Sequence, residues 1–203
     1  MTEATRVRTG LTPGARKILQ AAARLFYSRG ITAVGVDLIA KEAGVTKKTL
    51  YDRFGSKEAL VEAYLRERDE RWRGWLAGRV AAKAEASASE RILVTFDALE
   101  EWMRRENPRG CGFVNAAAEL PDPQHPGRAV ISEQKRWLCA YLRELAVEAG
   151  ARKPDRLAEE LILLHEGATV LNGLHVVAEP VARARSMARA ALKREGCAPA
   201  PAH

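Results

Sequence analysis

Apolar residues recur along this chain every three or four positions, the spacing that places them on one face of an α-helix. Val36, Ile39, Ala40 and Ala43 show this spacing within one short segment, at i, i+3, i+4 and i+7. The strict alternation of apolar and polar residues that is typical of strands is nearly absent, and the good helix formers Ala, Leu, Arg and Glu dominate. The pattern predicts an all-α protein.

Glycine and proline set the predicted ends of these helices, because glycine frees the backbone and proline removes a hydrogen-bond donor. Gly30, Gly44 and Gly55 separate the first four helices, and residues 107–110 and 121–127 form strong later breaks. The predicted helices cover residues 13–28, 36–43, 46–54, 56–84, 89–106, 113–120, 127–150, 154–178 and 179–195.

The second and third predicted helices, joined by a glycine turn and preceded by another helix, form a helix-turn-helix pattern. Small Ala40 and Ala43 allow the two helices to approach closely. The side chains of Leu50 and Phe54 are expected to face the interior and anchor the third helix there. A helix of this kind fits the major groove of double-stranded DNA, where lysines and hydroxyls bind phosphates and base edges. The candidate DNA contacts on its outer side are Thr46, Lys47, Lys48, Thr49 and Tyr51.

Positive charge is concentrated at the start of the chain. Residues 1–57 contain 11 Lys or Arg against 4 Asp or Glu, whereas residues 58–203 contain 22 of each, so the whole net charge of +7 lies in the first part. Localised cations favour binding to a polyanion, because they replace its condensed counterions. A solvated basic surface is the simpler interpretation of Lys47 and Lys48, and packing at a helix junction is the simpler one for Tyr51.

Residues 30–60, which include Leu-Tyr-Asp-Arg-Phe at 50–54 and Ser-Lys-Glu-Ala-Leu at 56–60, resemble the N-terminal signature of TetR-type repressors. The resemblance implies that the helix ending in Phe54 is the recognition helix and that Lys57 contacts a phosphate. In many members a Thr-Ser or Thr-Thr pair opens the second helix, but Val34 and Gly35 stand here. We expect backbone amides to replace that hydroxyl contact.

The same resemblance implies a helix-turn-helix domain, residues 1–57, joined by a long helix to an effector-binding and dimerisation domain, residues 58–203. It further implies a homodimer that releases its operator DNA when a small-molecule effector binds. No apolar run that could serve as a signal-peptide core follows Arg6 and Arg8, so we expect a cytoplasmic protein, and we expect no cofactor or metal. The effector itself is unknown from the sequence. Activation in place of repression is the alternative for a protein of this fold.

Polar and aromatic side chains embedded in apolar segments are candidates for the effector pocket. The candidates are Phe96, Trp102, Phe113, Asn115, Glu119, His125, Trp137, Tyr141 and His165. Each has a simpler interpretation: the tryptophans belong to the core, and Glu119 and His125 cap or bridge nearby backbone groups.

The predicted helix over residues 154–178 has more apolar surface than packing on one core requires, and small Gly173 favours close approach of another helix. A two-fold four-helix interface is one use of such a surface, and burial within the monomer is the other. The candidate interface residues are Leu161, Leu164, Ala168, Leu171 and Leu174.

Other functional classes have weaker support. No glycine-rich phosphate loop or nucleophile elbow is present, and Thr169 stands where a zinc-protease helix beginning at His165 needs its second histidine, so we expect no enzyme. Cys111 lies between glycines and suggests a redox-sensing alternative. Glu119, His125 and His165 suggest a metal-responsive one. Charged residues interrupt every apolar run, so we expect no membrane segment.

Overall fold

The computed structural model describes residues 11–106 and 109–197. These residues form helices joined by turns, and no strand occurs among them, so the predicted all-α class is confirmed. The predicted break at residues 107–110 lies partly outside the described residues. The helices are α1 (Pro13–Arg29), α2 (Val36–Ala43), α3 (Lys47–Phe54), α4 (Lys57–Ala81), α5 (Ala88–Glu106), α6 (Gly112–Glu119), α7 (Pro126–Glu148), α8 (Pro154–Leu174) and α9 (Pro180–Arg194).

The structure divides into two compact units, which we call unit 1 and unit 2. Unit 1 contains the chain up to Arg68 together with Phe113–Ile131, and unit 2 contains Asp69–Gly112 and the chain from Ser132 onwards. The predicted boundary after Lys57 stays a prediction, but these units divide the chain within α4 and assign most of α6 to unit 1. The chain therefore passes between the units inside α4, at the start of α6 and inside α7.

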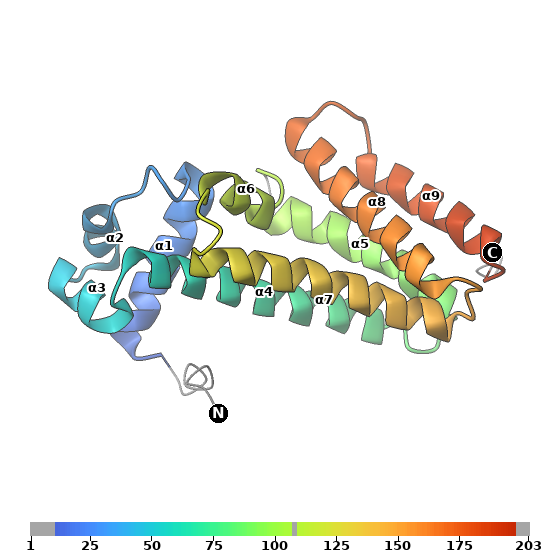
Figure 1. The fold of residues 1–203 in the computed structure, drawn as a ribbon, viewed down its shortest axis with the longest axis horizontal. Helices are drawn as coiled ribbons and strands as arrows, with labels where there is room; N and C mark the ends of the chain where they lie inside the picture. Colours follow the sequence, from blue (N-terminus) through green and yellow to red (C-terminus); the bar gives the residue numbers. More distant parts are fainter. Residues whose placement is uncertain (1–10, 107–108, 198–203) are drawn as a thin grey trace. The chain divides into compact units, whose positions relative to one another are not determined.

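In unit 1, helices α1, α2 and α3 contact one another pairwise (Figure 1). Ile18, Ile39 and Leu50 are fully buried, one from each helix. Gly44 ends α2 at φ 65° in the left-handed region, and its N–H bonds to carbonyls of the last helical turn. Glycine enters that region without strain, so the tight turn between α2 and α3 forms where the sequence predicts it.

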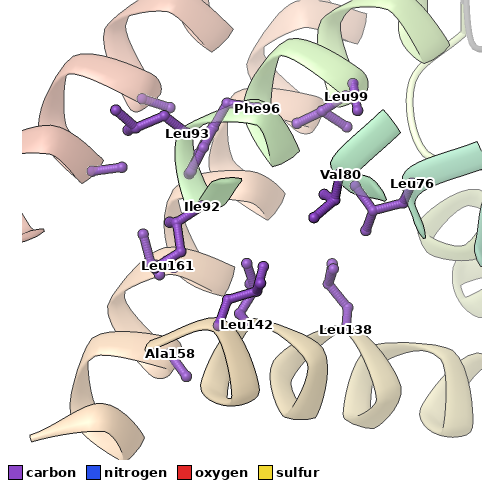
Figure 2. Close-up of a cluster of buried hydrophobic side chains, with 14 of the residues drawn as sticks. Leu76, Val80, Ile92, Leu93, Phe96, Leu99, Leu138, Leu142, Ala158 and Leu161 are labelled. Atoms are coloured by element: carbon purple, nitrogen blue, oxygen red, sulfur yellow. The ribbon is translucent and has the colours of Figure 1, made fainter. Parts of the chain in front are cut away.

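Unit 2 has a continuous apolar core, part of which is drawn in Figure 2. Leu76, Phe96, Leu142 and Leu161 contribute to it from α4, α5, α7 and α8, and all are fully buried. Helix α8 packs against α9, and both contact α5. In the described part of the chain, no helix is long and apolar enough to cross a membrane.

Two of the candidate interface residues belong to this core. Leu161 is 0% exposed and Ala168 is 4% exposed, so neither has surface to offer a second chain. Gly173 also serves a contact inside the chain: a Cβ there would lie 2.9 Å from Cα of Gly110. The apolar surface of α8 that does face outward includes Leu163 and Leu174, exposed by 71% and 63%. The candidates Leu171 and Leu174 at the end of α8 are thus exposed, whereas Leu161 and Ala168 are turned into the core.

Candidate nucleic-acid interface

Helix α3 presents a polar, basic surface on the side away from the core of unit 1. Leu50 is fully buried and orients the helix. Lys47, Lys48 and Tyr51 are exposed, with 41% of Tyr51 accessible. The structure thus brings the predicted contact residues together on one short helix. Packing at a helix junction explains Tyr51 less well, because a side chain that holds such a junction would be more deeply buried.

The two threonines at the start of α3 share their hydroxyl groups. Oγ1 of Thr46 accepts a hydrogen bond from the backbone N–H of Thr49 at 3.1 Å and lies 2.9 Å from Oγ1 of Thr49. Thr46 therefore caps the helix, as expected from its place in the sequence. One hydroxyl hydrogen joins the two oxygens, and the second remains to donate outward. The pair can cap α3 and still donate to a phosphate or a base edge.

Both lysines of α3 are paired with carboxylates. Nζ of Lys47 lies 3.1 Å from Asp37 of α2, and Nζ of Lys48 lies 2.9 Å from Asp52, one turn further along α3. These pairs are exposed, so they contribute little to stability. They hold the ammonium groups on the surface of α3. A DNA phosphate that approaches these groups must either displace each carboxylate or bind beside it. The Lys48 pair follows from its i,i+4 spacing, whereas sequence analysis missed Asp37.

The starts of α2 and α4 lie next to this surface in the sequence. Gly35 precedes α2, and no side chain caps that helix, so its first amides remain available as donors, as the departure at Val34 and Gly35 predicts. Ser56 caps the start of α4, where its Oγ accepts from the N–H of Ala59 at 3.0 Å. Lys57 is half-buried at the first position of α4. Its predicted phosphate contact remains a prediction.

Five of the nine candidate pocket residues lie in unit 2. Phe96 and Trp102 are buried in its core, and the Trp102 ring lies 5.5 Å from that of Trp72. Trp137 and Tyr141 are half-buried and stack with ring centroids 5.3 Å apart. Trp102 thus fits the core interpretation given above, while the stacked pair on α7 retains accessible surface.

His165 is the most unusual group in unit 2, because its imidazole is fully buried. Nε2 lies 3.0 Å from Oγ1 of Thr95, and that hydroxyl donates to the carbonyl of Ile92 at 2.6 Å. The hydroxyl hydrogen is thus used, so Nε2 carries the proton and donates it to Thr95. Nδ1 is then an acceptor, and it has no hydrogen-bond partner among the described residues. Burial, aided by the positive charge of Lys135, lowers the pKa of His165 to about 3.

A second polar cluster in unit 2 contains the cysteine singled out from the sequence. Nζ of Lys135 lies 2.7 Å from Oε1 of Glu166 and donates a hydrogen bond to Sγ of half-buried Cys111 at 3.6 Å. Burial lowers the pKa of Lys135, but the Coulombic effects of Cys111 and Glu166 outweigh it and leave the pKa raised. The cluster therefore holds a cation beside His165. Nothing local in the sequence joins Lys135 to Glu166, 31 positions away.

The other four candidate pocket residues, Phe113, Asn115, Glu119 and His125, belong to unit 1. Oε2 of Glu119 accepts from the backbone N–H of Thr32 at 2.8 Å, and Nδ1 of His125 accepts from that of Gly127 at 3.0 Å. Both side chains bridge backbone groups, which is the simpler of the two interpretations. Among the described residues, no group of three His, Cys, Asp or Glu side chains is placed to hold a metal.

Known proteins resemble the chain over both units. A family model described as bacterial regulatory proteins of the tetR family matches residues 18–64, and one described as a tetracyclin repressor-like C-terminal domain matches residues 88–188. The chain is 30% identical, over 148 residues, to the HTH-type transcriptional repressor KstR2 of Mycolicibacterium smegmatis, and the match covers 70% of each. The chain belongs to the TetR family. The resemblance of residues 30–60 is therefore confirmed.

Solved TetR-family structures share the fold. A TetR-family transcriptional regulator from Streptomyces coelicolor superposes with a TM-score of 0.80 at 29% identity, covering 90% of this chain and 95% of the other. The HTH-type transcriptional regulator YjdC of Escherichia coli is 24% identical over 74% of this chain and 78% of its own length. This TetR-family chain is thus a DNA-binding transcriptional regulator. The comparisons give no support to the redox-sensing or metal-responsive alternative.

Proposed function

We propose that the protein is a homodimeric repressor that holds an operator through α3 and releases it when a small molecule binds in unit 2. The exposure of Lys47, Lys48 and Tyr51 on one helix is the main support for α3 as the DNA-binding surface. The opposite side of this helix is fixed by buried Leu50. Repression, in preference to activation, is supported by the family relationship to a named repressor.

The exposed residues at and near the start of α3 supply both parts of operator recognition. Ammonium groups bind phosphates and give affinity that falls with salt, while Tyr51 and the Thr46–Thr49 hydroxyl pair offer donors and apolar surface to base edges. In a two-fold dimer, two such helices enter successive major grooves about 34–36 Å apart if the half-sites are one helical turn apart.

We expect Lys47→Ala and Lys48→Ala each to weaken operator binding and to reduce the slope of log affinity against log salt by roughly one unit per lost phosphate contact. The measurement is a fluorescence-anisotropy titration of labelled operator DNA over a salt series. Asp37→Asn is the matched control, because it frees Lys47 from its carboxylate. It should tighten binding. An unchanged slope in both lysine variants would mean that DNA binds another face.

The surroundings of His165 indicate the chemical class of the effector. The imidazole stays neutral, and its Nδ1 is a buried acceptor with no hydrogen-bond partner among the described residues. Oε1 of Gln134 in the same unit is also buried and without a partner among the described residues. Two buried acceptors without a partner favour an uncharged ligand with hydroxyl or amide donors. Candidate ligands added to the operator complex test this: neutral donors should release DNA, and carboxylates of matched size should not.

A homodimer formed through α8 and α9 is supported by apolar side chains that unit 2 leaves exposed. Leu163, Val170, Leu171 and Leu174 of α8 are at least 36% accessible, and Met187 of α9 is 58% accessible. Apolar surface gathered in this way is typical of an interface between subunits. Leu171 and Leu174 were expected there from the sequence, and Leu164 is half-buried at the edge of the core.

A further inference from the structure

The turn between α1 and α2 is held by a side chain from a distant part of the chain. Glu119 is the last residue of α6, and its Oε2 accepts a hydrogen bond of 2.8 Å from the backbone N–H of Thr32, 87 positions earlier. Both residues belong to unit 1, so the contact lies within one compact unit. A charged acceptor makes the stronger kind of hydrogen bond to a backbone N–H.

Gly30 gives the Glu119 carboxylate room to reach this turn. A Cβ on Gly30 would lie 2.9 Å and 3.1 Å from the two carboxylate oxygens, closer than such atoms normally approach. The backbone of Gly30 has φ 92°, a conformation that residues with side chains rarely adopt. The carboxylate therefore packs over Gly30 and bonds to Thr32, and it contacts the turn on both sides of buried Ile31.

The segment that presents Glu119 is itself fixed inside unit 1. Nη1 of Arg128 donates to the carbonyl of Ala117 at 3.0 Å, which ties the start of α7 to the end of α6. Leu120 is buried, and its Cδ1 lies 3.1 Å from the position of a Cβ on Gly127. Glu119 is thus carried by a packed segment, and its reach to Thr32 is set by that packing.

The position of this turn controls where α2 and α3 lie. The turn leads directly into α2, which begins at Val36 after Gly35 with no side-chain cap of its own. Helix α2 packs on α1 and α3, so a shift in the turn changes the orientation of the pair that presents Lys47 and Lys48. A turn entered and left through glycines needs an outside contact to hold one geometry.

We propose that Glu119 is a positioning residue for operator binding: it fixes the α1–α2 turn and so sets the orientation of the recognition helix. The inference rests on the DNA-binding function proposed above. Simple electrostatics points the other way, because a carboxylate in the basic unit repels phosphates and its removal should strengthen DNA binding. The sign of the change in affinity therefore distinguishes positioning from a plain charge effect.

The test compares Glu119→Ala with two charge-only variants by anisotropy on operator and scrambled DNA. Glu119→Gln removes the charge and keeps an acceptor for Thr32. Asp122→Asn removes a carboxylate from the next loop and keeps the local cap on Gln124. We expect Glu119→Ala to lose roughly tenfold in operator affinity, since a charge-assisted hydrogen bond is removed. The affinity of Glu119→Ala for scrambled DNA should stay the same or increase. Both charge-only variants should match or exceed the wild type on either DNA.

A second measurement reports the hydrogen bond directly. Exchange of the Thr32 amide proton, followed by NMR, should be slow in the wild type and in Glu119→Gln and fast in Glu119→Ala. If circular dichroism shows that Glu119→Ala does not fold, Glu119→Asp takes its place, because the shorter side chain cannot reach Thr32. The same loss of affinity is expected.

Two failures are distinguishable. If the wild type binds operator specifically and Glu119→Ala binds it equally or more tightly, Glu119 has no positioning role, although the DNA-binding function stands. If the wild type itself shows no sequence preference, the proposed function fails first. A tenfold loss shared by Glu119→Gln with a protected Thr32 amide would also overturn the proposal, because affinity would then be lost while the hydrogen bond to Thr32 was intact.

Discussion

Shortening Leu161 to alanine is expected to lower the free energy of unfolding by about 2–5 kcal/mol, the range for a leucine truncated in a packed core. Leu161 is fully buried and meets Leu142, Ile92 and Ala158 in the core of unit 2 (Figure 2). The truncation removes apolar contacts and leaves a cavity that its neighbours fill only in part. Urea unfolding followed by circular dichroism measures the loss, which should be the same at every protein concentration.

Leu163→Ala is the matched control for Leu161→Ala, on the same helix and with the same change of side chain. Leu163 is 71% exposed, so its truncation should leave the subunit's own stability nearly unchanged. If α8 forms the subunit interface, Leu163→Ala should instead lower the unfolding midpoint most at low protein concentration, where the weakened dimer dissociates, because association stabilises the folded state by mass action. If Leu163→Ala lost much free energy of unfolding at every protein concentration and Leu161→Ala lost none, Leu163 would belong to the core and Leu161 to the surface.

The stability of the protein should fall as pH is lowered from neutrality, with His165 as a main cause. Burial lowers the pKa of His165 in the folded protein to about 3, whereas its pKa in the unfolded chain is the ordinary value of 6.5. Below pH 6.5 the unfolded chain therefore binds a proton that the folded chain does not, and unfolding becomes easier. The slope approaches about 1.4 kcal/mol per pH unit, or about 2–3 kcal/mol between pH 7 and pH 4.5.

His165→Gln isolates this effect, because glutamine keeps a donor for Thr95 and does not titrate. Carboxylates and the other histidines contribute equally to both proteins, so the difference between their stability–pH curves belongs to His165. We expect the free energy of unfolding to fall less in the variant than in the wild type on acidification. The difference between the two slopes should approach the value for one proton, about 1.4 kcal/mol per pH unit. Parallel curves would show that His165 is protonated in the folded protein or accessible to water.

The sequence predicted the fold well where local signals decide it. Helical spacing, the Thr46 cap and the glycine after α2 are features of neighbouring residues, and the structure has α2 and α3 where they indicate. The outer surface of α3 could be predicted for the same reason: once Leu50 is buried, the geometry of a helix sends Lys47, Lys48 and Tyr51 outward.

What the sequence could not give depends on contacts between distant segments. For Glu119 the sequence leaves both a pocket role and a bridge to the backbone open, because its partner, the N–H of Thr32, is a backbone group that no residue type identifies. Leu161 and Ala168 were assigned to the interface because most of α8 is apolar, so the period alone does not say which residues meet α5 and α9. The neutral state of His165 likewise comes from complete burial, which its neighbours in sequence do not reveal.

The most direct test of operator recognition by α3 is an anisotropy titration of the wild-type protein on a duplex selected from a random pool, against a scrambled duplex, over a salt series. We expect a two-fold symmetric selected site, bound roughly a thousandfold or more tightly than the scrambled DNA. Its affinity should fall steeply with salt. Failure of the pool to yield a consensus, with equal and salt-insensitive binding to any duplex, would contradict this expectation.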